Sequence, residues 1–206
     1  NIGEISNKGV ETMVSAYIIR NLEKRLIWSL TGRVAYNRNR IEKLSDALKK
    51  DTEEAMKQNI EINSLLFEGD PTNAIYAVRS LGIDPSTGNE LYLDRNGNIT
   101  ETWNVADKVF LGTYDPKFRG NISSLFQWRG LSLNLAFGFH FGGYQYNTTL
   151  LNKVEIDKSM IAAGNVDRRV YSDRWQKPGD VKFFKKIDDT PTKATSRFVM
   201  KDNVLE

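Results

Sequence analysis

Hydrophobic and polar residues alternate strictly between Leu131 and Phe141. The odd positions are all large and apolar, whereas the even positions are small or polar. A period of two is the pattern of a β-strand with one apolar and one polar face. Eleven residues that rise about 3.3 Å each, tilted by about 45°, cover a height of about 25 Å, which matches the apolar band of an outer-membrane barrel. The row of apolar positions is Leu131, Leu133, Leu135, Phe137, Phe139 and Phe141.

The alternation predicts two hairpins. One joins a strand near 118–128 to the strand 131–141 through a tight turn at Arg129-Gly130, and the other joins strands near 9–19 and 25–37 through a short turn at 21–24. The 9–19 segment alternates less clearly than the other three. In this segment apolar and polar side chains both stand at odd positions, so they share one predicted face. These residues are Met13, Tyr17 and Ile19 together with Glu11 and Ser15.

Connection lengths give a second, independent clue. Both hairpin turns are short, whereas the connections near 38–117 and 142–194 are long, and a fifth strand is expected to start near Ser196. Short turns at one end and long loops at the other are typical of outer-membrane barrels, in which the long loops face the outside of the cell. The predicted fold class is therefore all-β, a segment of a transmembrane antiparallel β-barrel with long extracellular loops.

Regular elements are also expected within the first long loop. Apolar residues between Ile41 and Met56 follow a helical spacing, and Ser45 is a suitable N-cap for a short amphipathic helix. A short strand at 90–93 lies between two turn clusters. In the second cluster Asp94, Asn96 and Asn98 have the spacing of a calcium loop, but the glycine and glutamate that such a loop needs are out of place, which favours a hairpin turn.

The alternation also predicts which side chains meet lipid and which meet water. The lipid-facing set comprises Leu26, Trp28, Leu30, Leu133, Leu135, Phe137 and Phe139. The channel-facing set comprises Ser29, Thr31, Arg33, Asn134 and His140, and we expect His140 to hydrogen-bond a neighbour. Four loop aromatics have two open interpretations, contact with a substrate or packing of the loops: Trp103, Tyr144, Tyr146 and Trp175.

Composition narrows the possible chemistry. The 206 residues include no cysteine and one histidine, which excludes disulfides and leaves little for zinc or a Ser-His triad. No run of about 18 apolar residues exists that would form a transmembrane helix, whereas a barrel strand is apolar only at alternate positions. The net charge of +3 is spread along the chain, so we expect no nucleic-acid binding. We also expect no cofactor, no metal and no enzymatic activity, because no phosphate loop or nucleophile elbow occurs.

Several short motifs are informative through their order and spacing. They are Asn7-Lys8-Gly9-Val10-Glu11, Glu68-Gly69-Asp70-Pro71, Gly82-Ile83-Asp84-Pro85-Ser86-Thr87-Gly88, Arg174-Trp175-Gln176-Lys177-Pro178-Gly179-Asp180 and Ser196-Arg197-Phe198. Together these motifs resemble the SusC/RagA-type TonB-linked outer-membrane transporters of Bacteroidetes, and the resemblance extends over most of the sequence. The chain departs from that pattern at Gly120, where two glycines are more usual.

The resemblance implies a parent barrel of about 22 strands, as larger outer-membrane barrels have. It further implies an N-terminal plug, a TonB box, and a SusD-like surface lipoprotein as partner. Such a transporter uses energy from the inner membrane to import oligosaccharides or peptides. We expect residues 1–206 to form part of one barrel domain, without the plug and the TonB box, located in the outer membrane of a Gram-negative cell.

Two other protein classes are compatible with the alternating strands. A soluble glycan-binding β-sandwich would bury the apolar rows against a second sheet. A passive porin or adhesion barrel would have the same wall without a plug. Neither the sequence pattern nor the loops identify the substrate.

Overall fold

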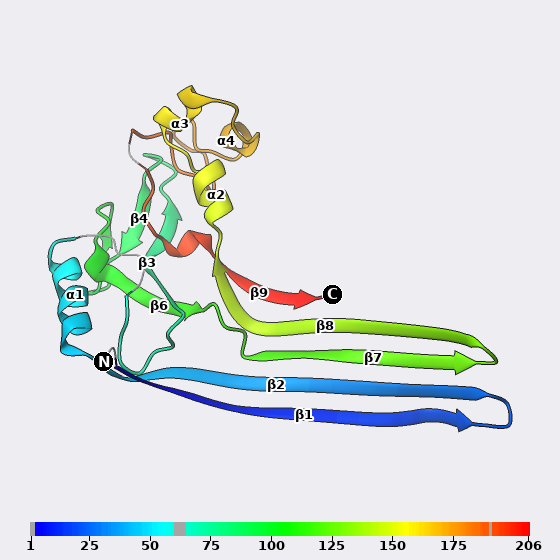
Figure 1. The fold of residues 1–206 in the computed structure, drawn as a ribbon. Helices are drawn as coiled ribbons and strands as arrows, with labels where there is room; N and C mark the ends of the chain where they lie inside the picture. Colours follow the sequence, from blue (N-terminus) through cyan, green and yellow to red (C-terminus); the bar gives the residue numbers. More distant parts are fainter. Residues whose placement is uncertain (1–2, 60–64, 190) are drawn as a thin grey trace.

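The computed structural model describes residues 3–59, 65–189 and 191–206. Figure 1 shows long strands that run alongside one another, with a unit of loops gathered at one end. We call these two parts the wall and the loop unit. The wall is a five-stranded antiparallel sheet, which supports the predicted all-β class, and within the described residues its outer strands do not pair to close a barrel. Its strands, in spatial order, are β1 (Gly3–Asn21), β2 (Leu26–Leu44), β7 (Phe118–Trp128), β8 (Leu131–Tyr146) and β9 (Val199–Leu205).

The short turns lie together at the end of the wall far from the loop unit, as Figure 1 shows. In the β7–β8 turn both central residues have positive φ, 49° at Arg129 and 101° at Gly130. This is the conformation of a type I′ hairpin turn, whose twist matches that of the flanking strands. The two long connections leave from the opposite end, so the predicted separation of short turns from long loops is confirmed.

The strands extend further than the sequence pattern predicts. β1 and β2 contain 19 residues each, and β8 continues to Tyr146 instead of stopping near Phe141. Conversely, Ser196–Phe198 form a turn of 3-10 helix (η2), so the last strand begins at Val199 and not near Ser196. Backbone hydrogen bonds of the ladder continue where side chains no longer alternate, and therefore the alternation underestimates strand length.

A β-bulge explains the position of Ile19 in the poorly alternating β1, whereas Met13 and Tyr17 lie on the face of Arg33 and Ser29. Val10 pairs with Tyr36 and Val14 with Gly32, but the register shifts between Tyr17 and Ile19. Beyond the shift Ile19 pairs with Trp28. Because residues directly opposite in an antiparallel pair lie on the same face, the extra residue changes the parity of the strand and returns Ile19 to the face of Val10 and Val14.

The loop unit is built from both long connections. The first contains a four-stranded antiparallel sheet and the predicted helix, whose N-cap Ser45 accepts a hydrogen bond from the Leu48 amide at 3.4 Å. The second contributes three short helices. The elements are α1 (Asp46–Lys57), β3 (Ala74–Ile83), β4 (Glu90–Leu93), β5 (Ile99–Thr100), η1 (Val105–Asp107), β6 (Lys108–Thr113), α2 (Thr148–Lys153), α3 (Lys158–Ala163) and α4 (Arg169–Ser172).

The hydrophobic core lies in the loop unit and not in the wall. One buried cluster surrounds the fully buried Phe198, and another surrounds the fully buried Val78 and Val105. In the wall, by contrast, Leu135 is 46% exposed and Phe137 is 50% exposed. No second sheet buries these two side chains among the described residues, whereas a β-sandwich would require one. None of the helices in the described ranges is both long and apolar enough to cross a bilayer.

Candidate functional site

The strand register joins the apolar rows into one surface. Trp28 lies opposite Phe126, which lies opposite Leu133, and Tyr36 is linked to Phe141 in the same way through Phe118. Opposed residues share a face, so the rows form a continuous apolar face over four strands. All seven residues predicted to face lipid lie on it, and their contact with lipid stays a prediction. The apolar face includes Val10, Val14, Leu26, Trp28, Leu30, Val34, Tyr36, Phe118, Ile122, Phe126, Leu131, Leu133, Leu135, Phe137, Phe139 and Phe141.

The indole donor of Trp28 is paired within the apolar face. The Trp28 indole Nε1 donates to Ser124 Oγ at 3.0 Å, across two neighbouring strands. Gly120 lies beneath the ring of Phe139, where an added Cβ would come within 2.6 Å of the ring and 2.1 Å of the Arg33 carbonyl oxygen. Glycine is therefore required at position 120 for the close approach of strand and ring. A face of this kind can contact hydrocarbon without leaving an indole donor unpaired.

The opposite side of the sheet forms the polar face, which carries all five residues predicted to face a channel. Ser15 Oγ and Thr31 Oγ1 lie 3.0 Å apart, and Arg33 Nε donates to Met13 Sδ at 3.2 Å. The predicted hydrogen bond of His140 is present, because its Nε2 lies 3.2 Å from an Asp202 carboxylate oxygen on β9. The other two residues predicted to face a channel are Ser29 and Asn134. Both lie opposite Leu125 in the strand register, so they share one face of the sheet.

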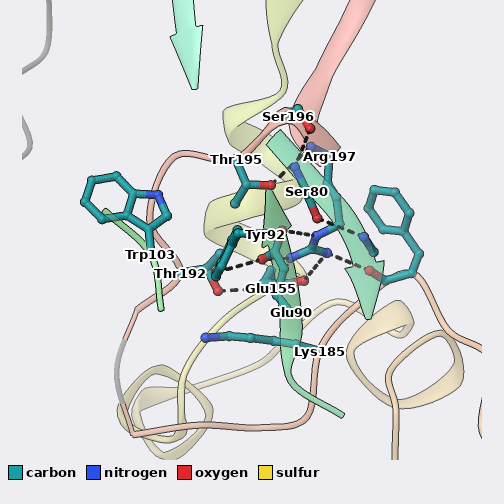
Figure 2. Close-up of polar contacts among 12 residues, drawn as sticks. Ser80, Glu90, Tyr92, Trp103, Glu155, Lys185, Thr192, Thr195, Ser196 and Arg197 are labelled. Carbon is teal, nitrogen blue, oxygen red and sulfur yellow. Dashed lines mark hydrogen bonds and ion pairs between the residues drawn. The ribbon is translucent and has the colours of Figure 1, made fainter. Parts of the chain in front are cut away.

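A buried arginine joins the two long loops, as Figure 2 shows. Arg197 Nε and Nη2 donate to the two oxygens of Glu90 at 2.8 and 2.7 Å, which is a bidentate pair. The same guanidinium donates to both oxygens of Glu155, at 2.6 and 3.1 Å. Glu90 belongs to the first loop and Glu155 to the second, and Arg197 precedes β9 directly. We call these three residues the loop junction.

The loop junction is almost completely shielded from water. The side chain of Arg197 is 6% exposed, and those of Glu90 and Glu155 are 1% and 0% exposed. Burial alone would raise the pKa of Glu90, but the hydrogen bonds and charge of Arg197 outweigh it and hold that pKa below its ordinary value. Burial likewise opposes the charge of Arg197, and the two carboxylates more than compensate, raising its pKa.

A second buried arginine supports the junction from the side. Arg174 is 2% exposed and donates to the carbonyl oxygens of Val154 and Ile156, at 2.7 and 2.9 Å, on either side of Glu155. Its burial lowers its pKa, and the charge of Glu155 acts in the opposite direction. Arg174 thus fixes the backbone that carries Glu155. Glu90, Glu155, Arg174 and Arg197 together contribute two positive and two negative charges.

The four aromatics predicted to lie in the loops all take part in packing, but Tyr144 and Tyr146 belong to the extended end of β8. Trp103 is 9% exposed and its Nε1 donates to the Ala194 carbonyl at 2.9 Å, from the first loop to the second. Trp175 Nε1 donates to the Pro85 carbonyl at 2.9 Å, again between the loops. Tyr144 lies over Gly112, and the Tyr146 hydroxyl accepts from the Thr195 amide at 3.2 Å. These contacts hold the loop unit together, and substrate contact by the same residues stays a prediction.

No arrangement suited to a metal ion is found in the described ranges, where three or more His, Cys, Asp or Glu side chains do not converge. Asp94 forms the turn that its spacing favours. One carboxylate oxygen accepts from the amides of Asn96 and Asn98 at 2.8 and 2.7 Å, so it closes the β4–β5 connection.

Sequence reasoning did not identify the loop junction. Glu90 lies 107 positions before Arg197, and Glu155 lies 42 positions before it. Each residue looks like an ordinary surface charge in its own segment. The only available signal was the Ser196-Arg197-Phe198 motif, which marked the segment without revealing the partners of its arginine.

Similar folds occur in a peptide transporter. A chain in a structure of the RagAB peptide transporter matches 100% of this chain with a TM-score of 0.74 and 20% identity. The RagAB peptide importer matches in its closed-closed state with a TM-score of 0.75, 20% identity and 100% coverage, and in its open-open state with 0.71, 18% and 98%. This chain covers 22%, 22% and 21% of those three chains, so it spans about a fifth of their length. No family model and no curated protein matches the sequence.

The likeness confirms the fold. At 18–20% identity it defines the architecture of the wall and its loops, and not the activity of the whole protein. The predicted all-β wall with long loops on one side is therefore shared with part of a solved transporter.

Proposed function

We propose that this chain is a wall segment, with two extracellular loops, of a SusC/RagA-type outer-membrane transporter that takes up oligosaccharides or peptides. The apolar face meets the lipid and the polar face lines the interior. The observation that carries the proposal is the uncovered apolar face over four strands, backed by a polar face. The likeness to the RagAB peptide transporter supports it independently of the side-chain pattern. The proposal assigns no enzymatic activity to the chain.

The parent protein would perform the transport. Five strands leave unpaired backbone groups at both edges of the wall, and in a bilayer those edges need further strands of a closed barrel. We propose that the remaining strands, a plug and a TonB box belong to the same parent protein. Energy then reaches the barrel through TonB.

A SusD-like surface lipoprotein is the proposed partner of the loop unit. In the second loop Tyr171 is 78% exposed and Val181 is 84% exposed, which is more than their apolar character favours in water. A lipoprotein that covers the loops would bury such side chains. The test is co-purification of the full-length transporter with the lipoprotein encoded beside it, for the natural protein and for Val181→Asp.

A pair of arginine substitutions tests the proposed facing. In the full-length protein Leu135→Arg places a charge on the apolar face, and we expect it to reduce the free energy of folding into bilayers by about 2–4 kcal/mol. Ala136→Arg, one position along the same strand, points to the polar face and should cost much less. Folding titrations into lipid vesicles measure both effects. Equal tolerance at positions 135 and 136 would contradict the proposed orientation.

A further inference from the structure

The polar face changes its chemistry along its length. Toward the short turns β2 and β7 carry uncharged groups on this face, such as Ser29 and Ser123. Nearer the loop unit two adjacent cross-strand rows carry charged side chains, and we call these rows, together with Asp202, the charged band. The rows are Glu11, Ala35, Arg119, His140 and Val204, and Met13, Arg33, Asn121, Gly138 and Glu206.

The cations of the charged band lie between its anions. Arg33 and Arg119 belong to β2 and β7, with Glu11 on β1 beyond them, and Asp202 on β9 and Glu206 lie on the other side. Neighbouring strands are about 4.8 Å apart, so β7 and β9 are separated by about 10 Å. Between them Gly138 contributes no side chain, and a Cβ at that position would meet no atom within 4 Å.

The space over the charged band is open to a ligand. A hollow of about 570 Å³ is lined by Arg119, His140 and Asp202, among others. A second hollow of about 380 Å³ lies against Arg33 and shares Arg119 with the first. In the part of the chain that the structure describes, Arg119 has no ion pair, and Asp202 engages one of its two oxygens, on His140. Both groups thus retain hydrogen-bonding capacity toward the hollows.

We propose that the charged band binds a peptide with free termini, its carboxylate on Arg33 and Arg119 and its ammonium group on Asp202. The planar guanidinium matches a carboxylate with two parallel hydrogen bonds. Three extended residues span about 10 Å, which matches the spacing of the strands β7 and β9 that carry Arg119 and Asp202. A neutral oligosaccharide carries neither charge, so it forms no ion pair with the charged band. This inference rests on the proposed function, because the polar face must line the path of the substrate.

Three forms of one tripeptide test the proposal on the purified full-length transporter. Trialanine carries both terminal charges, N-acetyl-trialanine lacks the ammonium group, and trialanine amide lacks the carboxylate. We expect each blocked form to bind about tenfold more weakly than trialanine, the effect of losing about 1.4 kcal/mol of interaction. Arg119→Gln should remove the preference for the free carboxylate, whereas Asp202→Asn should remove the preference for the free ammonium group.

Arg20→Gln is the matched control, because Arg20 lies on the same face near the short turn, where it pairs with Ile27. It should leave all three affinities unchanged, and its migration in unheated gels reports correct barrel folding for every variant. Equal binding of the three forms, or equal effects of Arg119→Gln and Arg20→Gln, would overturn the proposed site. Cells that still take up longer peptides in a TonB-dependent manner would then retain the proposed function without this site. If the cells took up no peptide in a TonB-dependent manner, both the proposed function and the proposed binding site would be wrong.

Discussion

The wall and the loop unit are stabilised by opposite means. In the wall, backbone ladders join the strands while large apolar side chains such as Phe137 remain half exposed. In the loop unit apolar side chains bury one another, and Phe198 is 0% exposed. Even its charged groups are internally paired, at Arg197. The loop unit therefore builds its own core and pairs the charge of Arg197 within it, whereas the wall leaves its apolar face uncovered among the described residues.

The largest effect is expected where the loop unit is most self-contained. Arg197→Met removes the cation of the loop junction and leaves two buried carboxylates without the charge that balances them. Breaking a buried pair in this way typically costs about 3–5 kcal/mol. Native-state proteolysis of the full-length protein should report that loss as faster cleavage in the loops. Strand pairing near the short turns, far from the junction, should be unaffected.

The control for this substitution is Arg169→Met. Arg169 Nη2 bonds Asp167 at 2.8 Å, but the arginine side chain is 44% exposed. An exposed pair contributes about 0–1 kcal/mol, so cleavage should change little. Similar cleavage rates for the two variants would mean that the loop junction does not hold the loops together.

A pair of glycine substitutions measures the packing between the loops. Gly88 has a φ of +73°, and an added Cβ would lie 2.5 Å from the ring of Trp175. Gly97 has a similar φ of +83° but no atom within 4 Å. Gly97→Ala should cost about 1–2 kcal/mol for the left-handed backbone alone. Gly88→Ala should cost about 1–3 kcal/mol more through the clash, and equal losses of loop stability would show that the Trp175 contact is not rigid.

Acid should weaken the loop unit before it affects the wall. The pKa of Glu90 is lower in the folded protein than its ordinary value of 4.5. The unfolded state consequently binds more protons in this range, so the stabilisation is complete above pH 4.5 and is lost as the pH falls through the folded pKa. Loop proteolysis measured from pH 6 downward should accelerate below about pH 4. Glu90→Gln should flatten that acid dependence, and an unchanged acid profile would contradict the role of Glu90.

The sequence predicts the wall far better than the loop unit. Alternation identifies the faces of β2, β7 and β8 because one side of each strand is consistently apolar. It fails in β1 because Met13 and Tyr17 lie on the polar face, and because the bulge after Tyr17 reverses the parity of the strand from Ile19 onward. Only a backbone register, which depends on the partner strand, reveals such a shift.

In the loop unit the decisive contacts join distant segments. The sequence indicates α1 and β4, since a helical spacing and turn clusters are local signals. The β3–β6 pairing and the Arg197–Glu90 pair connect residues far apart in the chain, and no local pattern encodes which segments meet. The packing of the loop aromatics, such as Trp103, likewise depends on distant segments, because its indole donates to Ala194.

A cysteine scan of β8 tests the central claim most directly. The chain contains no cysteine, so single cysteines can be placed at positions 131–141 of the full-length protein in lipid vesicles. A water-soluble maleimide should react at the even positions, including Asn134 and Ala136, and should be excluded from the odd positions, including Leu135 and Phe137. Equal reaction rates at adjacent positions, or faster reaction at Leu135 and Phe137, would contradict a wall with one face in lipid.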